Sequence, residues 1–445
     1  MGANRPRFHG WTMLGVAIAM GIATMPGQTV VVSLFNTSYR EALGLSVTQL
    51  SAAYTAGTIL AALPLSLVGK AADRFGLRIV TAVVALAFAG ALAMQSRVDH
   101  VVMLGVGFFF IRFLGQGSLG MLSGHTIAMW FERRLGTVHS FHALGFAAGS
   151  AIMPIPVAWL IEHHGWRPAL LVLAGFVLLL VMPPVLTVFR NKPEDIGQHL
   201  DGDPVEHAVH DVMHGGPPPP SDPAFTARQA MATRAYWIIV PIMLASGLIG
   251  TALLFHMQTM LQAGGIEGTE IQAAAAIQPW PIAFAVGTMI AGPLADRLRP
   301  SMLLGLSPVV MGASCLICLA AAAGLAPDGW TVALMGTGMG VFGVSQAISV
   351  AVGNPTIARY FGRTHHGAIR GTVTTLMVAG TGAGPLMAGA AYDLAGKSFT
   401  PILIAFTAAC VPLALSTIWL RPPTPPEIAD LTPDPDEPDP PGVAV

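Results

Sequence analysis

The sequence predicts an all-α membrane protein whose twelve transmembrane helices form two pseudo-symmetric six-helix halves. Three observations carry this prediction. Hydrophobic residues make up 53% of the 445-residue chain and charged residues only 10%, whereas an ordinary soluble domain carries about 25% charged residues. Apolar stretches long enough to cross a bilayer, about 20 residues each, occur twelve times along the chain. Patterns in the first half of the chain recur in the second.

The apolar stretches and the segments between them predict the organisation of the chain. We expect an N-terminal six-helix half at 1–189, a cytoplasmic linker at 190–235, a C-terminal six-helix half at 236–420 and a disordered cytoplasmic tail at 421–445. We expect the transmembrane spans at 11–36, 46–68, 79–96, 101–124, 136–160, 168–189, 236–261, 271–294, 301–324, 330–355, 368–391 and 399–420.

The distribution of Lys and Arg predicts which side of the membrane each loop faces. With the N-terminus taken as cytoplasmic, 17 of the 22 Lys and Arg residues fall in inside segments and four in outside loops, while Arg112 lies within a span. The positive-inside rule therefore predicts that both termini are cytoplasmic. We expect a multi-pass protein of the cell membrane, that is, a plasma or inner membrane.

The first span carries Gln28, Thr29, Ser33 and Asn36 in its second part. Thr29, Ser33 and Asn36 are spaced so that an α-helix places them on one face. Such a stripe either hydrogen-bonds a neighbouring helix or lines a cavity. We favour the cavity, because the stripe lengthens toward the outer end, and we expect these four residues to contribute to substrate binding or coupling.

A charged motif, GKAADRFGLR, joins the second and third spans. We predict a short gating loop in which Gly69, Asp73, Arg74, Gly76 and Arg78 latch the cytoplasmic side through charge-assisted hydrogen bonds to helix ends. The motif resembles the signature G-x-x-x-D-R-x-G-x-R of the major facilitator superfamily and matches it position by position. This resemblance implies the fold of that superfamily and a transport function.

The gating motif recurs as GPLADRLR, which contains Gly292, Asp296 and Arg297. Gly69 and Asp73 each lie 223 residues before their counterparts in this second copy. Internal repetition of this kind is typical of transporters whose substrate site lies near the bilayer midplane between two halves.

A second repetition concerns glycines in the fifth and eleventh spans. Gly145 and Gly149 recur as Gly380 and Gly384, at a spacing of 235 residues. Glycines on one stripe of a helix permit close contact with a neighbouring helix, and we assign that role to all four.

The fourth span contains Arg112, the only charged residue that does not fall in a loop, at a span boundary or in a tail. A charge at bilayer depth costs about 2.5–3.5 kcal/mol on insertion scales, so it must face protein or water. Gln116 lies on the same helix face. The superfamily resemblance implies a role for this pair in proton coupling or in holding the halves together. We keep two readings open for Arg112: an anion or proton-relay site, and a structural anchor to backbone carbonyls.

Further candidates for substrate binding or coupling are His142, His256, Gln278 and Gln346. His142 stands on the stripe of Gly145, and His256 is the only histidine within a span of the C-terminal half. Histidine titrates near neutral pH, yet packing near the cytoplasmic end also explains His142, and an interfacial position near the outer headgroups also explains His256. Gln278 precedes Pro279 and Pro281, which interrupt the backbone hydrogen bonds and expose carbonyls to a cavity.

Three segments sharpen the resemblance toward the monocarboxylate porter and oxalate/formate exchanger group: GWR from Gly165, PEDIG from Pro193, and FTARQAMATRAYW before the seventh span. In that group a cation in a C-terminal-half helix, often the eighth, pairs with the substrate carboxylate. The span 271–294 has no Arg, Lys, Asp or Glu. A dianion such as oxalate would need two fixed cations, so an oxalate-like substrate is disfavoured.

We therefore expect a secondary active transporter of a small organic monoanion, a monocarboxylate, that works by alternating access and is proton-linked or exchanging. The missing charge in the C-terminal half also fits an exporter of a neutral or amphipathic compound. A non-transporting membrane receptor or sensor on the same scaffold is a third reading. The expected partners are a small-molecule substrate, a proton as one option for coupling, and the lipid bilayer. The sequence leaves the oligomeric state open.

Other classes of function are disfavoured. No nucleotide-binding loop, intramembrane acid pair or metal-ligand set on one helix is present, so we predict that the protein is not an enzyme and expect no cofactor and no metal. His207, His210 and His214 have helical spacing in the linker, where a solvated run is the simpler reading. No long basic patch is present for nucleic acid.

Overall fold

A computed structural model describes residues 8–132, 134–202, 225–266, 269–327, 329–362 and 366–424. Within these ranges the chain forms helices and no strands, and twelve helical spans are long and apolar enough to cross a membrane. The predicted fold class and number of spans are thereby confirmed. The linker histidines and most of the predicted tail lie outside the described residues.

The N-terminal half contains the first six spans, several of which are divided into shorter helices. Its elements are α1 (Gly10–Ala23), η1 (Met25–Gly27), α2 (Thr29–Val32), η2 (Ser33–Phe35), α3 (Asn36–Leu43), α4 (Val47–Ala62), α5 (Leu65–Phe75), α6 (Leu77–Gln95), α7 (Val101–Ile111), η3 (Arg112–Leu119), α8 (Gly120–Ala128), α9 (Leu135–Ile152), α10 (Pro154–His164) and α11 (Trp166–Thr187).

The C-terminal half contains the other six spans. Its elements are α14 (Tyr236–Phe255), α15 (Met257–Ala263), α16 (Glu270–Ile277), α17 (Pro279–Arg297), α18 (Pro300–Ala322), α19 (Thr331–Phe361), α20 (His366–Leu394), α21 (Thr400–Ser416) and η6 (Thr417–Trp419). Short helices at Pro193–Ile196, Leu200–Gly202 and Ala227–Met231 lie between the halves in sequence.

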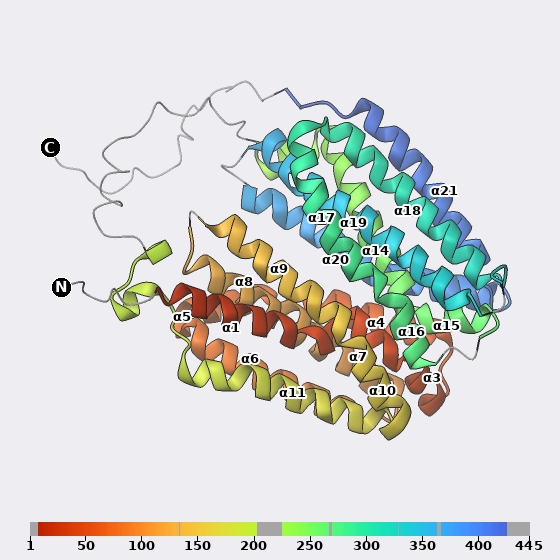
Figure 1. Cartoon of the computed structure of the whole chain (residues 1–445), viewed down its shortest axis with the longest axis horizontal. Coiled ribbons are helices and arrows are strands. Elements are labelled where there is room, and N and C mark those ends of the chain that lie inside the picture. The colour runs from red at the N-terminus through yellow and green to blue at the C-terminus, as the bar shows by residue number, and fades with distance from the viewer. Residues whose placement is uncertain are drawn as a thin grey trace, which may run out of the picture.

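The two halves lie side by side, the first coloured red to yellow and the second green to blue (Figure 1). We call the end at which α1 begins and α11 ends the linker end, and the end that holds α3, α10 and α16 the far end. Hydrogen bonds join the halves at the far end: the backbone N–H of Thr48 donates to Asp393 at 2.8 Å and that of Ile271 donates to Glu162 at 2.9 Å. The halves are therefore in direct polar contact there.

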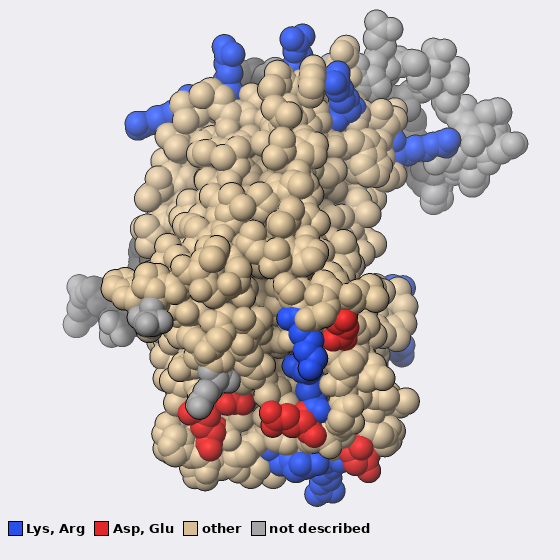
Figure 2. All heavy atoms as spheres, turned by 90° about the vertical axis from the view of Figure 1, so that its right-hand side faces the viewer, with Lys and Arg blue, Asp and Glu red and all other residues tan. Residues whose placement is uncertain are grey.

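Charged side chains gather unevenly on the far end. Figure 2 shows acidic and basic side chains together over the lower part of this face, which belongs to the N-terminal half, while the middle of the upper part is free of them. Interspersed charges of both signs are typical of a surface exposed to water. This end therefore has the character of an aqueous face, and the side walls between the ends have that of a lipid-facing surface.

The prediction that the charged motif forms a loop is wrong, because the motif is mostly helical. Gly69, Asp73 and Arg74 belong to α5, and α6 begins at Leu77, so the connection is Gly76 alone. Gly76 has φ +83°, a conformation that residues with a side chain rarely adopt, and this allows one helix to follow the other directly. In the second copy Gly292, Asp296 and Arg297 likewise lie in α17. The charged motif extends the helices beyond the apolar spans.

Candidate functional site

A cavity of about 180 Å³ lies between the two halves, and we call it the central cavity. Four of the residues predicted to bind substrate line it: Gln28, Thr29, Gln116 and Gln346. The remaining lining residues are Val30, Phe146, Ser150, Met243, Ser246, Gly247, Gly250, Thr251, Leu254, Trp280, Ser349, Val350, Met377 and Thr381.

The first span is interrupted beside this cavity. Met25–Gly27 forms a single 3₁₀ turn, and Gln28 is extended with φ −83° and ψ 147°, so helix resumes only at Thr29. Pro26 contributes to the interruption because it has no N–H to continue the hydrogen-bond ladder. Irregular backbone at membrane depth is tolerated only where protein or a cavity surrounds it. The break frees the carbonyl of Gly27 for a side-chain donor.

That donor is Arg112, which opens the π-helical segment η3 in the fourth span. A π-helical segment inserts an extra residue per turn and frequently marks a functional site. Arg112 is only 3% exposed. Its Nη1 donates to the Gly27 carbonyl at 3.1 Å and to Thr29 Oγ1 at 3.2 Å. The interpretation of Arg112 as a structural anchor therefore accounts for the hydrogen bonds of Nη1.

The other edge of the guanidinium has no such anchor. Within the described residues, both of its hydrogen bonds leave from Nη1, and Nε is buried without a partner. Its Cζ lies 5.2 Å from the centre of the Tyr54 ring, whose hydroxyl is 2.7 Å from Thr29 Oγ1. No acid in the described part of the chain pairs with it. The charge is thus buried against a ring face with its Nε–Nη2 edge unused.

Arg112 lines a second cavity of about 180 Å³, which we call the arginine cavity. Gln116 and Thr381 line both cavities, so the two adjoin. Thr58, one helical turn beyond Tyr54 on α4, also lines it, and its buried hydroxyl has no partner among the described residues. The arginine cavity therefore combines an unused guanidinium edge with an unpaired hydroxyl.

Several predicted residues lie away from both cavities. Ser33 donates to the Val30 carbonyl at 3.4 Å, and Asn36 donates from Nδ2 to the Phe255 carbonyl at 2.6 Å across the halves. His256 is 2% exposed, with Nε2 2.8 Å from the Pro385 carbonyl. Of the predicted polar stripe, Thr29 lines the central cavity, Ser33 bonds within its own span, and Asn36 joins the first span to α14.

His142 lies beside the first span and does not line the central cavity. Its Nε2 is 2.5 Å from Ser123 Oγ, which donates its own proton to the Ala17 carbonyl at 3.0 Å. With the serine proton used in that way, the histidine must donate to the serine. A general base has the opposite polarity, since it accepts the proton of its nucleophile. The pair therefore acts as a link between helices.

Gln278 and the repeated glycines occupy contacts between helices. Gln278 Nε2 donates to the Ala151 carbonyl at 3.1 Å across the halves. A Cβ placed on Gly145 or Gly149 would meet the side chain of Ile18 or Ile22 on the first span, and one on Gly380 or Gly384 would meet Leu244 or Leu248 of α14. Each glycine pair thus lies where its helix approaches the first helix of its own half.

The charged residues of the first gating motif differ in their exposure and in their hydrogen bonds. Asp73 and Arg74 are exposed. Arg78 instead binds the end of α11: its Nε donates to the Val185 carbonyl at 2.8 Å and its Nη2 to the Leu186 carbonyl. Arg78 therefore stabilises the N-terminal half at the linker end, and the described contacts of this motif remain within that half.

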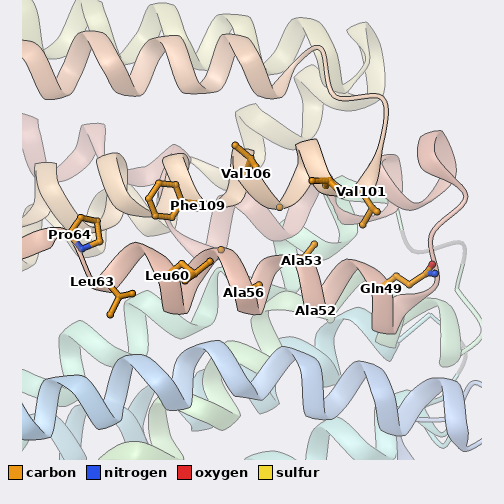
Figure 3. A pocket seen from close by; sticks show the side chains of 13 residues that line it. Gln49, Ala52, Ala53, Ala56, Leu60, Leu63, Pro64, Val101, Val106 and Phe109 are labelled. Atoms are coloured by element: carbon orange, nitrogen blue, oxygen red, sulfur yellow. The ribbon is translucent and has the colours of Figure 1, made fainter.

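A larger hollow in the described surface is apolar and lies elsewhere. It has a volume of about 810 Å³ and runs between α4 and α7, lined by Ala52, Ala56, Leu60, Val106 and Phe109 among others (Figure 3). Its only polar side chain is Gln49, at one end. A groove of this kind on a membrane-spanning surface contacts lipid tails, which are as apolar as its lining, and we do not assign the site to it.

The sequence analysis did not assign several residues to the site. Among them, Thr58, Ser246, Trp280, Ser349 and Thr381 line the cavities, and Tyr54 lies beside the Arg112 guanidinium. Ser and Thr hydroxyls are common in spanning helices because they bond to the preceding turn, so their type alone carries little information. Among the described residues, no group of three or more His, Cys, Asp or Glu is placed to hold a metal ion.

Comparison with known proteins gives this arrangement a context. The model of the Major Facilitator Superfamily matches residues 12–342 and 239–443. The uncharacterized MFS-type transporter YhjX of Escherichia coli (strain K12) is 20% identical over 308 residues, which are 69% of this chain and 71% of that protein. The gallate transporter of Pseudomonas putida is 27% identical over 197 residues, 40% of this chain and 41% of that protein.

Solved structures with the same fold have low sequence identity. The nucleoside transporter NupG superposes with a TM-score of 0.70 at 13% identity, covering 92% of this chain and 98% of its own. A bacterial homologue of the human lysosomal transporter Spinster, in an inward-facing and unoccupied conformation, gives a TM-score of 0.67 at 12% identity and covers 94% and 95%. At these identities the likeness concerns the fold.

Proposed function

The chain belongs to the Major Facilitator Superfamily and is a membrane transporter of that type, and we propose that its substrate is a small organic monoanion, a monocarboxylate. The observation that carries this proposal is the unused edge of Arg112 beside the cavities between the halves. Transport then proceeds by rocking of the two halves around this site, so that the site faces one side of the membrane and then the other.

A carboxylate suits the Nε–Nη2 edge of Arg112 for geometric and electrostatic reasons. The planar guanidinium presents two parallel N–H groups along that edge, and a carboxylate accepts both. The positive charge is removed from water, and the described residues supply no acid to balance it. An anion bound there neutralises the buried charge. Among the described residues, Arg112 is the only cation that lines either cavity, which favours one negative charge over two.

A relative supports the same class of substrate. The Pseudomonas putida protein is named a gallate transporter, and gallate is a monocarboxylate. The mode of coupling is proposed as proton-linked or exchanging. No histidine in the described part of the chain lines the central cavity or the arginine cavity, so we propose that a proton that travels with the substrate is carried on the substrate carboxyl itself.

The test is uptake of labelled monocarboxylates into proteoliposomes that carry the purified protein, with an inside-alkaline pH gradient imposed and then collapsed. Uptake by the parent protein establishes carboxylate transport, and its dependence on the gradient separates proton coupling from exchange. Arg112→Lys keeps the charge but loses the two-pronged edge, and Arg112→Gln loses both. We expect uptake to fall at least tenfold in both variants, with Arg112→Gln the more severe.

Arg97→Gln is the matched control, because Arg97 is an exposed cation of the same half and lies outside the gating motif. Uptake by Arg112→Gln equal to that of Arg97→Gln would remove Arg112 from the substrate site. Absence of flux across the whole panel with folded parent protein would overturn the carboxylate assignment. The exporter of a neutral or amphipathic compound and the non-transporting sensor would then be the readings to test.

A further inference from the structure

We propose that the substrate is a hydroxylated aromatic monocarboxylate, whose carboxylate binds the N-terminal half and whose ring hydroxyls bind the C-terminal half. This proposal rests on the proposed function and specifies the chemistry of the rest of the substrate. The arginine cavity accounts for the carboxylate. The central cavity has features that a bare carboxylate does not explain.

Two serine hydroxyls in the wall of the central cavity have no partner. Ser246 of α14 and Ser349 of α19 are 3% and 1% exposed, and within the described residues neither Oγ makes a hydrogen bond. Other buried serines of the C-terminal half are bonded: Ser307 donates to the Ser345 carbonyl at 3.0 Å and Ser314 to the Gly338 carbonyl at 2.7 Å. A buried polar group left unpaired costs about 1–3 kcal/mol. Two such groups at one cavity indicate that a ligand hydroxyl satisfies them.

The surroundings of these serines suit a flat ring. Phe146 from the N-terminal half and Trp280 from the C-terminal half both line the central cavity. The Trp280 indole is held in place, because its Nε1–H donates to Gln346 Oε1 at 2.8 Å. The thioether residues Met243 and Met377 also line the cavity, and sulfur makes favourable contacts with aromatic rings. An aromatic ring therefore has an aromatic partner on each half and thioether partners on the C-terminal half.

The arrangement of the two cavities determines which end of the substrate contacts which half. They adjoin at Gln116 and Thr381, and each holds about 180 Å³, which suits a compact molecule with two different ends. The anion end meets Arg112, on the fourth span, and the hydroxyl end meets α14 and α19. A substrate that touches both halves at once gains contacts from both, which is the condition for coupling its binding to their relative movement.

The test measures binding of three matched compounds to the purified full-length protein by isothermal titration calorimetry. The compounds are 3,4-dihydroxybenzoate, benzoate, which lacks the hydroxyls, and 1,2-dihydroxybenzene, which lacks the carboxylate. We expect the affinity of the protein for 3,4-dihydroxybenzoate to be higher than for benzoate or 1,2-dihydroxybenzene by about 10-fold or more, since each ligand hydrogen bond contributes about 0.5–1.5 kcal/mol. The double variant Ser246→Ala, Ser349→Ala should remove most of the advantage over benzoate and leave benzoate binding within about twofold of the parent.

The outcomes separate this inference from the proposed function. Equal affinity for benzoate and 3,4-dihydroxybenzoate, or an advantage that survives in the double variant, would overturn the hydroxyl site while carboxylate transport stands. Equal affinity for 1,2-dihydroxybenzene and 3,4-dihydroxybenzoate, with no effect of Arg112→Gln, would overturn the carboxylate site. Absence of binding by all three compounds to folded protein would overturn the substrate class.

A different observation carries a second inference: we infer that two carboxylates, one from each half, hold the far end closed. Asp393, at the end of α20, accepts from the backbone N–H of Thr48 at 2.8 Å and from its Oγ1 at 2.6 Å. Glu162, at the end of α10, accepts from the backbone N–H of Ile271 at 2.9 Å. Each carboxylate therefore crosses from one half to the first turn of a helix in the other.

The internal repeat shows that the two helix ends that donate these hydrogen bonds are equivalent. Thr48 and Ile271 are 223 residues apart, the spacing of the repeated gating motif. Each follows by two residues an N-cap with a capping box, Ser46 with Gln49 and Thr269 with Gln272. The first turn of a helix has free N–H groups and a positive dipole end, so a carboxylate there is stabilised. The two contacts close the two sides of the far-end interface in the same way.

The test attaches spin labels to the cysteines of Asp99→Cys and Lys397→Cys, which lie at the far end in different halves. Double electron–electron resonance measures the distance between the two labels. The native cysteines are buried. We expect Asp393→Asn and Glu162→Gln each to raise the population of longer distances about 3- to 10-fold, and the double variant to raise it further. Glu41→Gln, an exposed far-end acid, is the control. Distance distributions that match this control in all three variants would overturn the inference.

Discussion

The contact between the broken first span and the π-helical segment depends on the absence of a side chain at Gly27. A Cβ on Gly27 would lie 2.8 Å from the Ile111 carbonyl oxygen, 3.0 Å from the Gln116 nitrogen and 3.1 Å from the Gly115 Cα. Carbon atoms in contact prefer about 3.5–4.0 Å. All three neighbours are backbone atoms, so no side-chain rotation relieves the overlap.

We predict that Gly27→Ala separates the two segments and costs about 1–3 kcal/mol of stability, the range for overpacking of a tight interior. The same shift moves the Gly27 carbonyl away from Arg112 Nη1, which lies 3.1 Å from it. The guanidinium then reorients, and carboxylate uptake should fall tenfold or more. Thermal denaturation in detergent and proteoliposome uptake measure the two effects.

Two glycines on neighbouring helices provide matched controls. A Cβ on Gly15 of α1 or on Gly124 of α8 would meet no heavy atom within 4 Å. Alanine is favoured over glycine within a helix by about 1 kcal/mol, so Gly15→Ala and Gly124→Ala should be neutral or slightly more stable. Stability and uptake of Gly27→Ala within about twofold of these controls would refute the role given to the close contact.

Two further predictions concern packing and the linker end. Gly384→Ala should lower thermal stability and uptake, because its Cβ would lie against the backbone of Leu248, 2.9 Å from the carbonyl carbon. Gly371→Ala is the control and should lower neither, because its Cβ has no neighbour within 4 Å. Equal effects of the two substitutions would contradict the prediction. Arg78→Ala should cost about 1.5–3 kcal/mol, the worth of hydrogen bonds from a charged donor, and exposed Arg74→Ala should cost little; matching denaturation curves for the two would show that the contact with α11 contributes nothing.

The fold was predictable because lipid imposes a strict length and composition on each span, and because the repeated motifs relate the halves. The site was only partly predictable. Arg112 stood out through the cost of a buried charge, Gln116 followed from its position on the same helix face, and Gln28, Thr29 and Gln346 were predicted as polar residues within apolar spans. Regular 3.6-residue periodicity did not anticipate the break at Gly27 or the π-helical segment.

The misplaced candidates share a physical reason. His256, Asn36 and Gln278 are polar residues within spans, and each one bonds to a backbone carbonyl of another helix. The sequence contains no information on which carbonyls are free, since that depends on how helices cross. The charged motif at Asp73 was read as a loop because apolar length was used as the limit of the helix, whereas α5 continues beyond it.

The irregular backbone of the first and fourth spans beside the site has no counterpart in the equivalent spans of the C-terminal half. Within the described residues, the first span is broken at Met25–Gly27 and the fourth turns π-helical at Arg112–Leu119, whereas their repeat counterparts α14 and α19 remain α-helical across the cavity. A duplicated scaffold thus encloses a site whose two walls differ. A bound molecule with two unlike ends would then keep one orientation through the whole transport cycle, and it would cross the membrane without tumbling.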